Sequence, residues 1–438
     1  MLNVTEADVS KLKIFQDCDT IFYDITLVRK PMFCPICGSK MIGHGHKKKT
    51  INHPALRDHN GVILYNANRY RCKVCNKTLL ERNPFTFPGF NSSFLLIRQT
   101  MKMLKNLNYN LKMISEELNI STTQICKYLD SYVVIPPRTL PESLGIDEIH
   151  NKYLSRKNSS YLCILVDNTN RHIYDILDSR NKAHLASYFS KYTREQRLKV
   201  KYVTIDMWEP YKSVVNVYLP NAIIAVDPFH VIWHLTNAFD RLRLDIMKQC
   251  EYGSPSYYLL KSWNWLLSTD SVDLDNERVY NRYFHKKLNR RDILDMILQS
   301  FPILAQAYEL KEEYRYINKC CSYEEAYERF DVIYQKFKSC GIPQFYEFTS
   351  LLFHWREEIL NSFLRPYDDR KLTNALSENV NKQIRRYLSV SNGVSNYTRF
   401  RKRVLYALSP DMYYSITHKL RSDQQHKRHK KKYKNLNN

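Results

Sequence analysis

The chain has 438 residues, of which 44% are hydrophobic, and its 67 Lys and Arg against 44 Asp and Glu give a net charge of +23. This composition excludes a disordered protein and predicts roughly two to four domains with real cores. The apolar runs are of strand length, so no transmembrane helix is expected. The positive charge predicts a polyanionic partner, with nucleic acid ahead of an anionic membrane surface.

The first residues lack the charged-then-apolar order of a secretory signal. We therefore expect a cytosolic protein, associated with the nucleoid if the host is a bacterium. Only four of the eleven cysteines stand in motif spacing, so a disulfide framework is not expected.

Those four cysteines form two Cys-x-x-Cys pairs in segment 1–90, about thirty-five residues apart. They are Cys34, Cys37, Cys72 and Cys75. Two such turns can bring four thiolates into a tetrahedron around zinc, so we predict a zinc ribbon with a structural Zn²⁺ ion that presents basic residues to DNA. Four unrelated buried cysteines, or a ligand from His44 or His46, are the alternatives.

Segment 91–138 has helical periodicity interrupted by a turn at 119–121. A helix capped by Ser121 or Thr122 would follow this turn and present Thr123, Gln124 and Lys127 outward. This spacing is typical of a helix-turn-helix whose second helix reads the major groove. Plain helical packing shows the same periodicity and stays open as an alternative.

Segment 139–228 changes to an α/β pattern. The expected strands are 144–147, 160–166, 172–177, 200–206 and 222–227, with helices at 183–192 and 211–218. Three strands, a helix, a strand, a helix and a strand is the order of the ribonuclease H-like fold. In that fold the first and fourth strands are neighbours, so Asp147 and Asp206 would meet.

An all-α insertion is expected over 229–370, because helical patterns dominate there, with helices at 231–250, 256–267, 276–285, 292–311 and 323–338. Its tryptophans could stack on an unpaired base, although such residues are more often core. Segment 371–412 would complete the catalytic core, and the charge run within 413–438 predicts a disordered basic tail.

A third carboxylate, Glu378, lies on a predicted helix of segment 371–412. Leu376, Val380, Ile384 and Leu388 repeat every four residues, whereas Glu378, Asn381, Lys382 and Arg385 are expected on the opposite face, near phosphates. The competing acidic residues Glu357, Glu358, Asp368 and Asp369 lie upstream without this pattern. Three carboxylates in a basic protein favour metal-dependent phosphodiester chemistry, because Mg²⁺ accepts few protein oxygens and must be shared.

With these motifs, the sequence resembles the DDE transposases of the ISL3 family of bacterial insertion sequences. The resemblance is carried by the segments 145–148, 206–211, 227–231, 377–381 and 397–403. It implies a transposase that binds the inverted repeats of its element and moves that element by DNA cleavage and strand transfer. By position, Asp147, Asp206 and Glu378 match the catalytic triad that holds two Mg²⁺ ions, with Mn²⁺ as a substitute.

The resemblance also implies further roles. Asp227 and His230 would lie beside the active site without binding metal, unless Asp227 only caps the helix that follows. Arg401 and Arg403 would contact DNA. Transposon-end DNA and target DNA are the implied partners, and pairing two ends implies at least a dimer. A sequence-specific DNA-binding regulator with an inactive core, and a structure-specific nuclease or resolvase, are the alternative functions.

Overall fold

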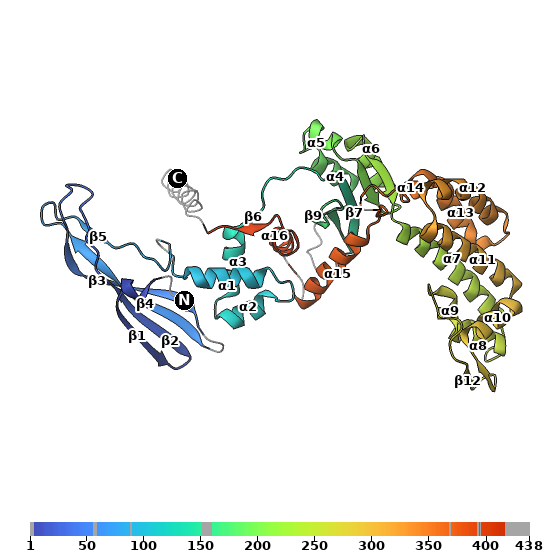
Figure 1. Ribbon diagram of the computed structural model, residues 1–438, viewed down its shortest axis with the longest axis horizontal. Coiled ribbons are helices and arrows are strands. Elements are labelled where there is room, and N and C mark those ends of the chain that lie inside the picture. Colours follow the sequence, from blue (N-terminus) through green and yellow to red (C-terminus); the bar gives the residue numbers. More distant parts are fainter. Residues whose placement is uncertain are drawn as a thin grey trace, which may run out of the picture. The chain divides into compact units, whose positions relative to one another are not determined.

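The computed structural model describes residues 4–55, 59–87, 90–150, 160–367, 369–391, 394 and 396–416 (Figure 1). These residues form a multidomain α/β protein with two compact units. Unit 1 contains the described residues up to Arg138 and from Val380 onward, and unit 2 contains Thr139–His150 and the described residues from Ser160 to Asn379. The expected tail at 413–438 lies largely outside the described residues.

The N-terminal part of unit 1 is a five-stranded sheet that follows the short helix η1 (Glu6–Asp8). Its strands are β1 (Val9–Asp17), β2 (Thr20–Leu27), β3 (Ile42–Pro54), β4 (Asn60–Arg71) and β5 (Thr78–Leu80). The order is β1-β2-β4-β3, with β5 paired to β4. Alternate residues of β4, including Ile63 and Tyr65, are buried. Residues 62–65 therefore belong to a strand with one face in the core and one face towards the surface.

Helices from both ends of the chain make the rest of unit 1. They are α1 (Phe94–Leu104), α2 (Leu111–Leu118), α3 (Thr122–Tyr132) and α16 (Tyr397–Leu408), with β6 (Val133–Val134) paired to β14 (Tyr413–Tyr414). Ser121 caps α3 by accepting a hydrogen bond from the Gln124 N–H, as its position predicts. Asn119 ends α2 in the left-handed conformation at φ 50°, which produces the tight turn between α2 and α3.

A second five-stranded sheet lies in unit 2. Its strands are β7 (Ser143–His150), β8 (Tyr161–Asp167), β9 (His172–Leu177), β10 (Tyr202–Ile205) and β11 (Ile223–Val226), and its helices are α4 (Lys182–Phe189), α5 (Arg194–Leu198) and α6 (Glu209–Tyr218). The strand order is β11-β10-β7-β8-β9. Strands β7, β8 and β9 pair antiparallel, whereas β10 pairs in parallel with both β7 and β11. All five strands begin within three residues of their expected positions.

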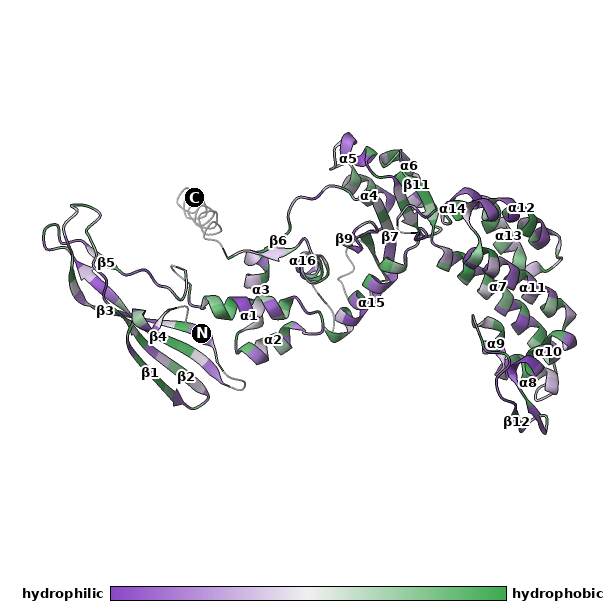
Figure 2. Cartoon of the chain, viewed as in Figure 1, coloured by the Kyte–Doolittle hydropathy of each residue, from purple (hydrophilic) through white to green (hydrophobic). Residues whose placement is uncertain are grey.

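A helical segment follows β11 in unit 2. Its elements are α7 (Pro228–Gln249), α8 (Pro255–Ser262), α9 (Asn264–Ser268), β12 (Val279–Asn281), β13 (Lys286–Leu288), α10 (Arg290–Ser300), α11 (Pro302–Cys320), α12 (Tyr323–Ser339), η2 (Pro343–Phe345), α13 (Tyr346–His354) and α14 (Arg356–Asn361). Hydrophobic and hydrophilic residues alternate around these helices (Figure 2). Their apolar faces share one core with the sheet of unit 2. The final long helix is α15 (Ala375–Val390), within which the boundary between the two units falls.

The structure corrects one feature of this segment. A helix was predicted over 276–285, but β12 and β13 form an antiparallel hairpin there, so the segment is not entirely helical. The Asn281 side chain accepts hydrogen bonds from the backbone N–H groups of Tyr283 and Phe284, and His285 has a positive φ of 52°. These local bonds stabilise a turn in place of a helix.

None of the helices in the described residues combines the length and apolar character needed to cross a membrane.

Candidate active site and metal centres

Three aspartates lie in one row across the sheet of unit 2. Asp147 belongs to β7, Asp206 directly follows β10, and Asp227 directly follows β11. The parallel registers of β10 with β7 and with β11 bring Asp206 level with both of the other aspartates. The sheet therefore brings together Asp147 and Asp206, as the sequence predicts, and adds Asp227 to them.

His230 closes this row from the first turn of α7. Its Nε2 atom lies 3.0 Å from Asp206 Oδ1. Ligand atoms of Asp206, Asp227 and His230 lie within 4.8 Å of one another, close enough to hold one metal ion. Asp227 is also the N-cap of α7, since its side chain accepts from the Phe229 N–H. Asp227 therefore caps α7 and also lies close to Asp206.

The three carboxyl groups of the row lie close together in a largely buried position, which disfavours their negatively charged forms. Burial, together with the charge of Asp206, raises the pKa of Asp147 to about 7. Burial raises the pKa of Asp227 to about 6, although the backbone N–H of Asn374 acts in the opposite direction. Burial favours neutral His230, but the hydrogen bond and charge of Asp206 outweigh it and raise the pKa of His230 to about 9. Such shifts are typical of sites that bind a cation or move protons.

The start of α15 lies against this row through Asn374. The Asn374 side-chain amide donates to the Ile146 carbonyl of β7 at 3.1 Å, and its backbone N–H faces Asp227. A Cβ atom on Gly145 would lie 3.0 Å from Asn374 Oδ1 and 2.5 Å from Val166 Cγ2, so glycine allows this close approach.

Glu378 lies one turn beyond Asn374, in the first turn of α15. Its backbone N–H donates to the Asn374 carbonyl at 3.1 Å, and its side chain is exposed. No interaction between Glu378 and an aspartate of the row is recorded among the described residues. The structure therefore gives Glu378 a position near the row but no direct contact with it.

A neighbouring ion pair was not predicted from the sequence. Arg180 pairs with Glu148, the residue after Asp147, and its guanidinium stacks over the rings of Tyr161 at 3.9 Å and Trp208 at 4.5 Å. Arg180 stands in a loop without a motif. In the sequence, the ion pair could have been suspected only from Glu148, because Glu148 directly follows a candidate catalytic residue.

The four predicted zinc ligands do converge. Sulfur atoms of Cys34 and Cys75 lie 3.4 Å apart, those of Cys37 and Cys72 lie 3.4 Å apart, and all four lie within 4.8 Å of one another. Tetrahedral zinc with Zn–S bonds of about 2.3 Å needs sulfur separations of about 3.8 Å. The N–H and hydroxyl groups of Ser39 hold the pKa of Cys37 down to about 6. The cluster is therefore compatible with a structural zinc ion.

The sequence profile of the ISL3 family of DDE transposases, described as "Transposase", matches residues 144–404. The match includes the row of aspartates, His230 and Glu378, and it covers more than half of the chain. The chain belongs to this family.

Curated relatives agree with this membership. The chain is 23% identical over 363 residues to the transposase for insertion sequence element IS1001 of Bordetella parapertussis, which covers 81% of this chain and 84% of the relative. It is 25% identical over 265 residues to the transposase for insertion sequence element IS1557 of Mycobacterium tuberculosis, which covers 57% of this chain and 56% of the relative.

The residues expected to contact DNA differ in exposure in this ISL3-family transposase. Thr123 and Lys127 of α3 are exposed, as are Lys382 and Arg385 of α15, whereas Gln124 is half-buried. These positions are compatible with an interface but do not identify one.

Two side chains of unit 1 differ from the sequence-based prediction. Arg403 was expected at DNA, but it is only 1% exposed and donates to the backbone carbonyls of Asn106 and Tyr109. It therefore joins α16 to the segment between α1 and α2. Asn381 was expected on the polar face of α15 and is buried, although Val380 and Ile384 are buried as predicted. Arg401 remains half-exposed.

Proposed function

We propose that this ISL3-family protein is a DDE transposase that binds the inverted repeats of an insertion sequence and catalyses metal-dependent DNA cleavage and strand transfer. The observation that carries this proposal is the row of Asp147, Asp206 and Asp227 beside the helix of Glu378, in which burial raises the carboxyl pKa values of Asp147 and Asp227. A basic chain attracts DNA, and a concentrated acidic row within it can hold the cations that DNA cleavage requires.

The sheet of unit 2 supports a ribonuclease H-like core. Its order β11-β10-β7-β8-β9, with three antiparallel strands followed by two parallel ones, is the order expected for that fold. The helical segment 229–370 then interrupts the core between β11 and α15. In this arrangement the carboxyl ends of β10 and β11 present their aspartates at one edge, where α/β sheets bind ligands.

The donor set fits hard divalent cations such as Mg²⁺ or Mn²⁺. Carboxylate oxygens are the ligands these ions prefer, and Asp227 Oδ2 is buried without a hydrogen-bond partner among the described residues. We assign Asp147, Asp206 and Glu378 as the ligands. When bound, two such ions supply an activated attacking oxygen and a stabilised leaving oxygen.

The protein's own groups would orient this chemistry. Asn374 fixes the start of α15 against β7 and so sets the direction of Glu378. His230 holds one oxygen of Asp206 and leaves the other for a cation. Asp227 caps α7. Beyond that, Asp227 either lies beside the site without binding metal, as the resemblance implies, or is a further ligand, as its separation from Asp206 allows.

Unit 1 would recognise DNA. We assign the cysteine cluster as a structural Zn²⁺ site of a zinc ribbon, and α2 and α3 as a helix-turn-helix that presents Thr123, Gln124 and Lys127 to a major groove. Lys382, Arg385 and Arg401 would contact phosphates. Pairing two element ends requires at least two protomers. Such a protein would act on DNA in the nucleoid of its bacterial host.

The test uses purified full-length protein and a duplex that carries the inverted repeat read from the DNA flanking the gene. Wild type should nick this duplex at the element end with Mg²⁺ and not with EDTA. Asp147→Asn should bind the duplex with unchanged affinity and lose nicking by at least about a thousandfold, as expected when an electrostatic contribution to catalysis is removed. Binding without nicking by wild type would favour a regulator with an inactive core.

A further inference from the structure

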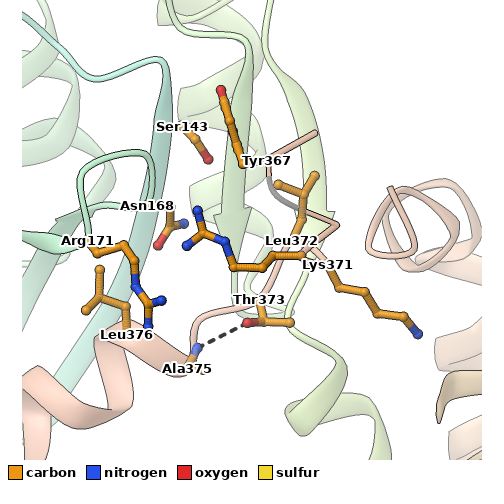
Figure 3. Close-up of a pocket in the computed structure, with 10 residues that line it drawn as sticks. Ser143, Asn168, Arg171, Tyr367, Lys371, Leu372, Thr373, Ala375 and Leu376 are labelled. Atoms are coloured by element: carbon orange, nitrogen blue, oxygen red, sulfur yellow. Dashed lines mark hydrogen bonds between the residues drawn. The ribbon is translucent and has the colours of Figure 1, made fainter. Parts of the chain in front are cut away.

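A cavity of about 320 Å³ lies in unit 2 where β7 and α15 begin (Figure 3). It is lined by Ser143, Asn168, Arg171, Tyr367, Arg370, Lys371, Leu372, Thr373, Ala375 and Leu376. None of the aspartates in the row, and neither His230 nor Glu378, belongs to this lining. The cavity is therefore a separate feature.

The charged side chains that line the cavity in the described part of the chain are all cationic. Arg370 and Lys371 come from the loop before α15, and Arg171 comes from the turn between β8 and β9. Lys371 Nζ already donates to the Asn318 carbonyl. Arg171 is exposed and has no hydrogen bond or ion pair recorded with the described residues. Its guanidinium is therefore available to a ligand.

Two further donors in the cavity have no partner. Ser143 is 0% exposed, and its Oγ atom makes no hydrogen bond with the described residues. Asn168 Nδ2 is likewise buried and without a hydrogen-bond partner. Figure 3 shows both side chains within the ring of residues around the cavity. Because an unsatisfied buried donor costs stability, such donors indicate a bound acceptor.

The beginning of α15 adds a fourth donor group. This helix has 16 residues, and Ala375 and Leu376 in its first turn line the cavity. Among the described residues Asn374 Oδ1 finds no hydrogen-bond partner, so this side-chain oxygen does not cap the helix. The Ala375 N–H makes a long hydrogen bond to Thr373 Oγ1, at 3.5 Å. First-turn N–H groups and the helix dipole favour an anion at this position.

We propose that this cavity binds a phosphate group of the DNA backbone. The ligand chemistry follows from the donors alone, whereas the choice of DNA rests on the proposed function. The same helix that begins at the cavity carries Glu378 in its first turn. A phosphate held there would fix the strand beside the phosphodiester bond that is cut, and it would orient that bond without taking part in the reaction.

The test compares Arg171→Gln with Arg194→Gln in the full-length protein. Arg194 is a matched control, because it is an exposed arginine of unit 2, on α5, without a recorded partner among the described residues. Affinity for the element-end duplex is measured over a series of salt concentrations. Each phosphate of the duplex is then replaced in turn by an uncharged methylphosphonate. Ser143→Ala provides a second variant that removes only a hydroxyl group, and thermal melting checks that all variants fold.

For Arg171→Gln we expect about a tenfold loss of affinity, since a charge-assisted hydrogen bond is lost. The slope of log K against log salt should fall by about 0.9 for one lost phosphate contact. A methylphosphonate at one position should weaken DNA binding by the wild type, and it should not weaken DNA binding by Arg171→Gln any further. Ser143→Ala should weaken binding without changing the slope, and Arg194→Gln should match wild type.

Equal behaviour of Arg171→Gln and Arg194→Gln, or the absence of a methylphosphonate position coupled to Arg171, would overturn the phosphate site. Nicking is measured in the same preparations, so the two proposals can fail separately. Nicking without the coupling rejects the cavity alone. The coupling without nicking rejects the proposed activity and keeps the cavity.

Discussion

His230 Nε2 lies 3.0 Å from Asp206 Oδ1, at the centre of the acidic row. The two residues come from different elements, since Asp206 ends β10 and His230 lies in the first turn of α7. This pair supplies a positive charge inside a site that otherwise collects carboxylates. A divalent cation that binds there must therefore share Asp206 with an imidazolium ion.

The first prediction concerns pH and metal binding. Asp147 and Asp227 have folded-state pKa values of about 7 and about 6, above their ordinary value of 3.8, so their stabilising effect is present below pH 4 and is lost as pH rises through 7. The His230 contribution is present below pH 6.5 and is lost as pH rises through about 9. Metal-free protein should therefore become less stable from pH 4 to pH 9.

Mg²⁺ should reverse this trend, because it replaces protons on the carboxylates. Thermal melting at pH 5 and at pH 8 should show a larger gain from Mg²⁺ at pH 8, where a hundredfold excess over Kd contributes about 2.7 kcal/mol. Asp147→Asn is the control and should lose most of this gain. A gain of equal size at both pH values would contradict the assignment of the row as a cation site.

The second prediction separates Glu378 from Asp227 as the third ligand. If Glu378 binds metal, Glu378→Gln should abolish nicking and keep DNA binding, whereas Asp227→Asn should retain both nicking and stability, since asparagine caps a helix about as well as aspartate. Nicking and melting temperature are measured for both variants. Loss of nicking in Asp227→Asn with an intact melting profile would instead make Asp227 a ligand.

The third prediction concerns the cysteine cluster. If the cluster holds zinc, removing the metal with a chelator, or replacing Cys72 with Ala, should unfold the part of unit 1 around the cysteines and weaken end binding at least about tenfold, because metal binding and folding are coupled. Zinc content by mass spectrometry and DNA footprinting measure the two effects. Cys320, which is exposed and outside the cluster, provides the control substitution Cys320→Ala. Unchanged footprints after complete zinc removal would reject the assignment.

The fourth prediction concerns two arginines of α16. Arg403→Leu should destabilise unit 1 by about 1–3 kcal/mol, because it removes the hydrogen bonds that Arg403 donates to the Asn106 and Tyr109 carbonyls. Arg401→Leu should lower the melting temperature less than Arg403→Leu, because Arg401 is half-exposed, and it should lower DNA affinity if Arg401 contacts phosphate. A stable Arg403→Leu variant with weakened DNA binding would restore the prediction made from the sequence.

Periodicity and spacing predicted most of what local chemistry determines. The Ser121 cap, the Cys-x-x-Cys turns and the strands that end at Asp206 and Asp227 follow from short windows of sequence. Contacts between segments that are far apart in the sequence could not be predicted from such short windows. The burial of Arg403 depends on α16 packing against α1 and α3, and the hairpin at 279–288 depends on one asparagine turn that the helical pattern concealed.

Unit 1 is not a contiguous piece of the polypeptide. Its helices α1–α3 are joined to residues much later in the sequence, through the hydrogen bonds of Arg403 and the pairing of β14 with β6. A ribosome must therefore synthesise the last helix before this unit can finish folding. A fragment that stops at residue 138 would expose apolar helix faces, and it is a poor substitute for the whole protein in DNA-binding experiments.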